Sequence, residues 1–189
     1  MSRWEPDARG RLERAALELY SERGFEQTTA AQIAERAGLS ERTFFRHYAD
    51  KREVLFGGAR LLEQTFVETL AAVPEAVAPM DAMGVTLEVV AEVFADRYEP
   101  ARQRQAVIAA NAELRERELI KLASLSSALA STFRGRGVED TAARLAGEAG
   151  VAVFKVGFER WMGDGGRGLG EHLGEALVEL RRLVVAGSA

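Results

Sequence analysis

The sequence predicts an all-α protein of about nine helices, in which a small three-helix head precedes a larger helical body. Apolar residues recur with the period of an α-helix through almost the whole chain of 189 residues. The alternating runs of β-branched residues that are typical of strands are absent. Proline, which interrupts helices, occurs only four times. These observations favour a fold built from helices alone.

Three helices are expected at the start of the chain, at about residues 7–23, 30–37 and 41–47. Thr29 and Gln32 form the T-x-x-Q pattern of a capping box at the start of the second helix. Gly38 permits a tight turn after that helix, because glycine has no β-carbon to resist the bend. Ser40 is then placed to cap the third helix. Two short helices joined by a glycine-containing turn indicate a helix-turn-helix.

A fourth helix, at about 51–72, is expected to connect the head to the body, with Asp50 and Glu53 at its start as caps. We therefore place the helix-turn-helix domain at 1–50 and the body at 51–189. Five more helices are expected in the body, at about 80–98, 101–110, 112–133, 138–162 and 169–186.

The composition argues against several classes of protein. Cysteine is absent, which excludes disulfides, thiolate metal sites and cysteine nucleophiles. Neither His47 nor His172 has a second ligand at metal-binding spacing, and no nucleophile, base and orienting group stand out together. We therefore expect neither an enzyme nor a bound cofactor or metal. The sequence has no signal-peptide core and no membrane-spanning apolar run, so we expect a soluble, cytoplasmic protein without membrane contact.

Basic side chains gather around the third helix, although the net charge of the chain is −4. The segment 42–52 contains Arg42, Arg46, Lys51 and Arg52 but only one acidic residue. A small basic patch on an acidic body can bind phosphates locally, but the protein cannot be a general polyanion binder.

The third helix is expected to act as a recognition helix in the major groove of double-stranded DNA. The polar residues that would project from it or lie beside it are Ser40, Arg42, Thr43, Arg46 and His47. Among these, Arg42 and Thr43 are expected to contact base edges. The residues expected to hold the phosphate backbone are Thr28, Thr29, His47, Tyr48 and Lys51. The alternatives are an ordinary solvated face for the arginines and a partly buried core position for His47.

Three segments together resemble the N-terminal domain of the tetracycline-repressor (TetR) family: Glu22–Thr29, Ile33–Ser40 and Thr43–Lys51. The resemblance covers about residues 7–60. It implies an all-helical homodimer with an N-terminal DNA-binding head and a C-terminal ligand-binding body. The family often has tyrosine where this chain has Phe45, and that hydroxyl frequently touches phosphate, so the resemblance does not carry this contact over.

The last two helices are expected to form the dimer interface, because each carries a wide apolar stripe. The expected interface residues are Leu145, Ala149, Ala152 and Val156 on one helix and Leu173, Leu177, Leu180 and Val184 on the other. Two copies of this helix pair would form a four-helix bundle. Gly147 and Gly150 would let the helices approach closely.

A small, largely apolar ligand is expected to bind between the helices of the body. The candidate lining residues are Phe66, Val90, Phe94, Asn111, Leu125, Phe154 and Phe158. The alternative for each of these residues is a simple core position.

The helix-turn-helix predicts a DNA-binding regulator, and as a homodimer it would bind an inverted-repeat operator. The resemblance further implies a ligand-responsive repressor that a small molecule releases from DNA. Two alternatives stay open, an activator and a helical scaffold protein without sequence-specific DNA binding.

Overall fold

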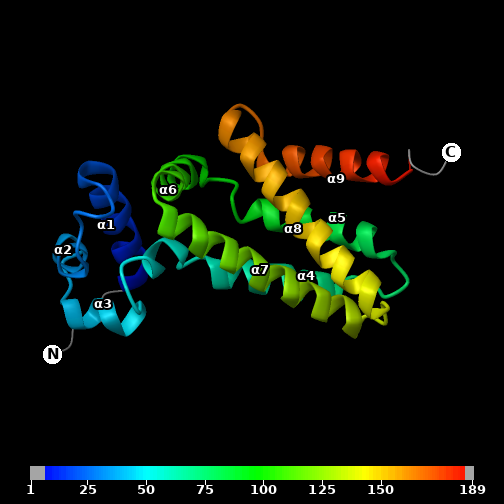
Figure 1. The fold of residues 1–189 in the computed structure, drawn as a ribbon, viewed down its shortest axis with the longest axis horizontal. Helices are drawn as coiled ribbons and strands as arrows, with labels where there is room; N and C mark the ends of the chain where they lie inside the picture. Colours follow the sequence, from blue (N-terminus) through cyan, green and yellow to red (C-terminus); the bar gives the residue numbers. More distant parts are fainter. Residues whose placement is uncertain (1–6, 186–189) are drawn as a thin grey trace. The chain divides into compact units, whose positions relative to one another are not determined.

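The computed structural model of this chain describes residues 7–185, with the side chains of residues 7–183. Within this range the chain forms nine α-helices and one short 3-10 helix, without strands (Figure 1). The predicted all-α fold is therefore confirmed. None of these helices is long and apolar enough to cross a membrane.

The chain folds into two compact units. The head unit contains residues 7–60 and, in addition, Pro100–Glu118. The body unit contains Leu61–Glu99 and residues 119–185. The chain therefore passes from one unit to the other within three helices, α4 (Ala59–Ala72), α6 (Tyr98–Ala110) and α7 (Ala112–Gly135).

Each of the first three helices begins at a residue whose side chain caps it. They are α1 (Ala8–Arg23), α2 (Ala30–Arg36) and α3 (Glu41–His47). The Thr29 side chain accepts a hydrogen bond from the Gln32 N–H, and the Gln32 side chain accepts one from the Thr29 N–H. The Ser40 side chain accepts from the Thr43 N–H at 3.2 Å. Both predicted caps are therefore confirmed.

The single helix expected at 51–72 is wrong, because the chain forms two separate helices there. A 3-10 helix, η1, spans Glu53–Phe56, and α4 begins only at Ala59. Gly57 and Gly58 lie between them, where two successive glycines weaken a continuous α-helix. The Asp50 carboxylate accepts hydrogen bonds from the backbone N–H groups of Arg52 and Glu53, and Glu53 is the first residue of η1.

The apolar core of the head is completed by residues that lie far along the chain. Leu12 of α1 and Phe44 of α3 are fully buried in this core. Ile108 of α6 and Leu114 of α7 are fully buried in the same cluster. Residues 100–118 are expected in the body from the sequence, whereas the structure groups them with the head.

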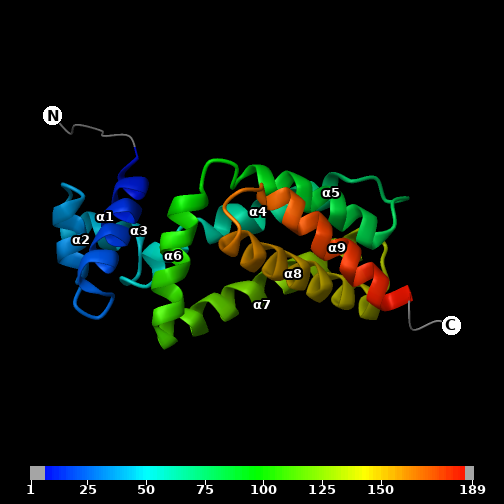
Figure 2. The same ribbon diagram turned by 90° about the horizontal axis from the view of Figure 1, so that it is seen from above.

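The body packs α5 (Pro79–Glu92) and α8 (Asp140–Gly163) around α9 (Leu169–Val185). Figure 2 shows α9 running beside both helices. A β-carbon added to Gly157 would lie 3.0 Å from the Leu173 Cα, so glycine allows α8 and α9 to approach closely. The expected helix at 80–98 ends earlier, at Glu92, and α6 instead begins at Tyr98, with Pro100 in its first turn, where proline is tolerated.

Arg136, just after α7, is buried within the body and caps the C-terminal end of α4. Its guanidinium donates hydrogen bonds to the carbonyl oxygens of Leu70, Val73, Pro74 and Val77. The last carbonyl groups of a helix have no partner within the helix and carry partial negative charge. Arg136 therefore supplies the missing donors and a compensating positive charge.

Candidate nucleic-acid interface

The turn between α2 and α3 is fixed by backbone geometry and by α1. Gly38 has a φ of +66°, a left-handed conformation that residues with a β-carbon rarely adopt. The Leu39 N–H donates to the Ala34 carbonyl at 2.8 Å, and the Arg11 guanidinium donates to the Ala37 carbonyl. This turn therefore sets the angle at which α3 leaves α2.

The side chains of α3 divide into an inner and an outer face. Phe44 is fully buried and anchors the helix to the core of the head. Arg42, Phe45 and Arg46 are exposed on the other side. Within the described part of the chain, neither arginine makes a hydrogen bond or an ion pair. The outer face of α3 thus presents two arginines whose hydrogen-bond donors are available to a partner.

Thr43 lies beside this outer face and is half-buried. Its hydroxyl is 3.0 Å from that of Ser40, so the two side chains share a hydrogen bond at the start of α3. Thr29 is exposed at the start of α2. These three hydroxyl-bearing residues lie at the surface of the head, where a nucleic acid could contact them.

Thr28 is buried and Lys51 is half-buried, and the hydrogen-bond donors of both side chains are engaged within the head. The fully buried Thr28 hydroxyl donates to the Gly24 carbonyl at 2.9 Å. The Lys51 ammonium donates to three carbonyl oxygens, those of Phe25, Glu26 and Thr28, and lies 4.3 Å from the centre of the Phe25 ring. All three N–H donors of Lys51 are thus used to fix the loop between α1 and α2.

Tyr48 is also turned inward, so its hydroxyl is not placed for a phosphate. The residue is buried, and its hydroxyl donates to the Glu13 carboxylate at 2.7 Å. Burial, together with this contact to Glu13, raises the pKa of Tyr48 above its usual range. The Tyr48 hydroxyl therefore links the end of α3 to α1, in place of the predicted contact with the phosphate backbone of DNA.

His47, at the end of α3, is half-buried, and its Nε2 atom is enclosed without a hydrogen-bond partner in the described residues. The pKa of His47 is held below its ordinary value mainly by burial. The nearby positive charges of Arg46 and Arg9 lower it further. The imidazole is therefore neutral near pH 7, and a negative charge nearby would favour its protonation.

A polar clamp that no sequence pattern indicates joins η1 to α6 and α7 within the head. Arg104 donates to the Leu55 carbonyl at 2.7 Å and forms an ion pair with Glu118 at 3.2 Å. Arg117 forms a second ion pair with Glu53 at 2.5 Å. These partners lie 14 to 64 residues apart in the chain, so no local pattern could reveal them.

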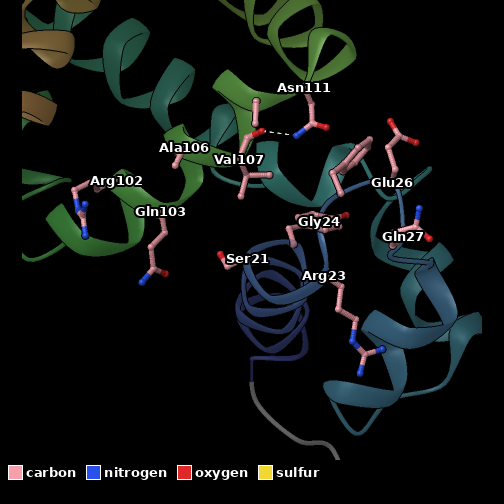
Figure 3. Close-up of a pocket in the computed structure, with 13 residues that line it drawn as sticks. Ser21, Arg23, Gly24, Glu26, Gln27, Arg102, Gln103, Ala106, Val107 and Asn111 are labelled. Atoms are coloured by element: carbon pink, nitrogen blue, oxygen red, sulfur yellow. Dashed lines mark hydrogen bonds between the residues drawn. The ribbon is translucent and has the colours of Figure 1, made fainter.

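An open groove of about 540 Å³ lies in the head between the end of α1, the following loop and α6 (Figure 3). Apolar side chains such as Phe25 and Val107 line it together with polar ones. Asn111 also lines this groove, and its side-chain amide donates to the Val107 carbonyl at 2.7 Å. Asn111 thus belongs to the head unit, whereas the other expected pocket residues belong to the body unit.

The other expected pocket residues lie in the body, where four phenylalanine rings are in contact. Phe66 meets Phe154 with ring centres 5.6 Å apart, and Phe94 meets Phe158 at 5.7 Å. Phe154 and Phe158 are 5.8 Å apart, so the rings form one continuous cluster. Trp161 extends the cluster. Val90 and Leu125 are buried in the same unit.

The expected dimer residues are split between an exposed and a buried set. Leu145, Ala152 and Val156 are exposed on α8, and Ala149 is half-buried. On α9, Leu180 is half-buried, whereas the side chain of Val184 lies outside the described residues. The exposed set occupies one stripe of α8.

Leu173 and Leu177 do not belong to that exposed set, because other helices of the same chain bury them. The two glycines expected at the dimer interface also face inward. An added β-carbon on Gly147 would lie 2.7 Å from the Ser126 carbonyl oxygen, and one on Gly150 would lie 2.5 Å from the Met83 side chain. These residues therefore pack the body of a single copy.

Comparison with known protein families assigns both parts of the chain. The model of bacterial regulatory proteins of the tetR family matches residues 13–56, which include α2 and α3. The model of the MftR C-terminal domain matches residues 69–184, more than half of the chain. The chain belongs to the tetR family. The tetR family consists of transcriptional regulators rather than enzymes.

Individual relatives of this tetR-family chain include a curated regulator and several solved structures. This chain is 41% identical over 75 residues to the HTH-type transcriptional regulator TcmR of Streptomyces glaucescens. The match covers 40% of this chain and about a third (33%) of TcmR. FadR of Thermus thermophilus, a TetR-family repressor solved in complex with lauroyl-CoA, is 27% identical with a TM-score of 0.52, over 93% of both chains. FadR of Bacillus subtilis, solved with stearoyl-CoA, shares the fold at 20% identity and a TM-score of 0.58, over 89% of this chain and 95% of that one.

Proposed function

We propose that this tetR-family chain is a ligand-responsive repressor that binds an inverted-repeat operator through α3. The outer face of α3 carries this proposal. Arg42 and Arg46 project from it without partners in the described residues, on a helix that Ser40 caps and Phe44 anchors. A rigid helix with available guanidinium groups suits the major groove, whose base edges present hydrogen-bond acceptors.

The proposed DNA contacts fall into two groups. Arg42 and Thr43 contact base edges, because both lie in the first turn of α3. Ser40, Thr29, Arg46 and His47 contact the phosphate backbone or lie beside it. The hydrogen bonds of Thr28, Tyr48 and Lys51 within the head support a different role, in which these residues fix the loops around α2 and α3.

We further propose that the chain forms a homodimer through the exposed stripe of α8. Leu145 and Val156 are 66% and 41% exposed, although leucine and valine are usually buried. They are joined along the stripe by Ala149 and Ala152, whose small side chains permit a close helix crossing. A two-fold axis through this stripe would repeat the head and so match an inverted repeat.

The proposed ligand is largely apolar and binds in the body among the phenylalanine rings around Phe154. The contacts among these rings support this place, since aromatic side chains bury large apolar areas. The T. thermophilus FadR structure contains lauroyl-CoA, whose acyl chain is apolar. A ligand can release the protein from DNA only if it binds the two conformational states with different affinity.

Selection from random DNA duplexes with the purified full-length protein tests this function. We expect an enriched inverted repeat, and we expect lauroyl-CoA, as the first probe, to weaken binding to that repeat by roughly 5- to 150-fold. Because coupling is reciprocal, the selected DNA must weaken lauroyl-CoA binding by the same factor. The absence of any enriched sequence contradicts the proposed DNA binding. Equal lauroyl-CoA affinity with and without DNA contradicts its proposed role as the releasing ligand.

A further inference from the structure

The position of Phe45 on α3 is unusual for a large apolar side chain. The residue is 51% exposed, whereas its neighbour Phe44 is fully buried. The two rings meet edge to face with centres 5.4 Å apart, so Phe45 rests on the anchored ring. Because α3 is capped and anchored, the position of Phe45 on the surface is well fixed.

Two arginines flank Phe45 on the outer face of α3. Arg42 lies one turn earlier, at the i−3 position, and Arg46 is the next residue. Neither guanidinium has a partner among residues 7–185. A partner of this surface must therefore present a small apolar group to the Phe45 ring. On either side of that group it must present hydrogen-bond acceptors or negative charge to the two arginines.

The major groove of DNA has this combination of groups. Guanine O6 and N7 are acceptors that suit arginine, and phosphates line the edges of the groove. The C5-methyl group of thymine is the apolar group that base pairs present in the groove, and phenylalanine is among the residues that contact it. The side chain of Phe45 has no hydrogen-bond donor, so it can contribute only an apolar contact.

We propose that Phe45 is a specificity-determining residue that contacts the C5-methyl group of one thymine in each half-site. This thymine lies next to the base that Arg42 reads. The inference rests on the proposed function, because it assumes that α3 enters the major groove, and it deepens that function by naming a base that the protein prefers.

A double-mutant cycle between protein and DNA tests the contact. Each thymine of the selected operator is replaced in turn by deoxyuridine, which lacks only the methyl group. We expect one thymine in each half-site to be sensitive to this replacement. Replacing that thymine alone should weaken wild-type binding about fourfold, the factor for one buried methyl group. In Phe45→Ala the same replacement should change the affinity by less than about 1.5-fold, because the contact is already lost. Val85→Ala, which shortens an exposed apolar residue on α5, is the matched control and should keep the full fourfold effect.

A second measurement uses the wild-type protein, so it does not depend on how the variant folds. The operator carries 5-iododeoxyuridine at the methyl-sensitive thymine, and the cross-linked residue is identified after irradiation. Cross-linking to Phe45 supports the contact. Cross-linking to another residue there, or an equal deoxyuridine effect in wild type and Phe45→Ala, overturns it while leaving DNA binding intact. If no operator is selected at all, the proposed function fails and this inference fails with it.

Discussion

The ammonium group of Lys51 is fully engaged within the head, because it donates to three backbone carbonyls around the loop before α2. Removing it in Lys51→Met leaves these acceptors without their donor, so we expect a loss of about 1–3 kcal/mol in the free energy of unfolding. Urea denaturation measures this loss. Arg46→Met, at an exposed site, is the control and should change stability by less than about 0.5 kcal/mol. The opposite result is unchanged stability in Lys51→Met together with a weaker salt dependence of DNA binding, its slope reduced by about 1. That result would support the predicted phosphate contact of Lys51.

The depressed pKa of His47 gives DNA binding a predictable pH dependence. Burial and neighbouring arginines lower the pKa of His47 in the unbound protein and so favour the neutral imidazole. Nearby phosphates would raise this pKa, so binding takes up a proton and the affinity for DNA should increase as the pH falls from 8 through about 6. Anisotropy titrations across this range measure the effect, and His47→Gln should be less sensitive to pH. An equal pH dependence in both proteins would show that His47 does not lie near phosphate.

At the scale of the element, Arg136 determines how the last turn of α4 is held. Replacing it in Arg136→Met leaves buried carbonyl groups such as that of Leu70 without their donor. We expect a loss of about 3 kcal/mol in the free energy of unfolding. Arg134→Met is the matched control, because Arg134 is exposed and its contacts in the described residues, an ion pair with Asp140 and a long hydrogen bond to Ser131, lie at the surface. A surface ion pair is worth about 1 kcal/mol or less. Thermal and urea unfolding compare the two variants, and equal losses would refute the capping role of Arg136.

The helices of the head could be predicted from the sequence because their signals are local. Thr29 and Ser40 each accept a hydrogen bond from a backbone N–H group three residues later. The sequence pattern of a cap and the hydrogen bond that forms it therefore involve the same few residues. The break after η1 was missed, although its cause, the pair Gly57 and Gly58, is also local. The apolar spacing of that segment favours one continuous helix, whereas its two glycines favour a break.

The tertiary role of individual polar residues could not be predicted in the same way. Arg136 meets Leu70 across 66 residues and Lys51 meets Phe25 across 26. A lysine near a recognition helix has the same sequence pattern whether it binds phosphate or a carbonyl group. Likewise, the apolar stripe that contains Leu173 looks the same whether another copy or the same chain covers it. Packing decides these cases, and packing depends on residues that are distant in the sequence.

At the scale of the whole molecule, the proposed dimer depends on the exposed stripe of α8. Val156→Glu places a charge at one end of this stripe, and burying it without a partner is costly, so we expect a monomer at micromolar concentration. Sedimentation equilibrium gives the mass directly. Val89→Glu, at a similarly exposed site on α5, is the control and should leave the mass of the wild type unchanged. A wild-type protein that sediments at the mass of one chain contradicts the proposed dimer.

The central claim is that the outer face of α3 reads a DNA sequence, and Arg42→Ala tests it most directly. The measurement is the affinity of wild type and variant for the selected operator and for a scrambled duplex at one fixed salt concentration. We expect wild type to prefer the operator by at least about 10³-fold. Arg42→Ala should lose about 1–3 kcal/mol on the operator and much less on the scrambled duplex, because a base contact has been removed. Equal losses on both duplexes, or a wild type without preference, would contradict the claim.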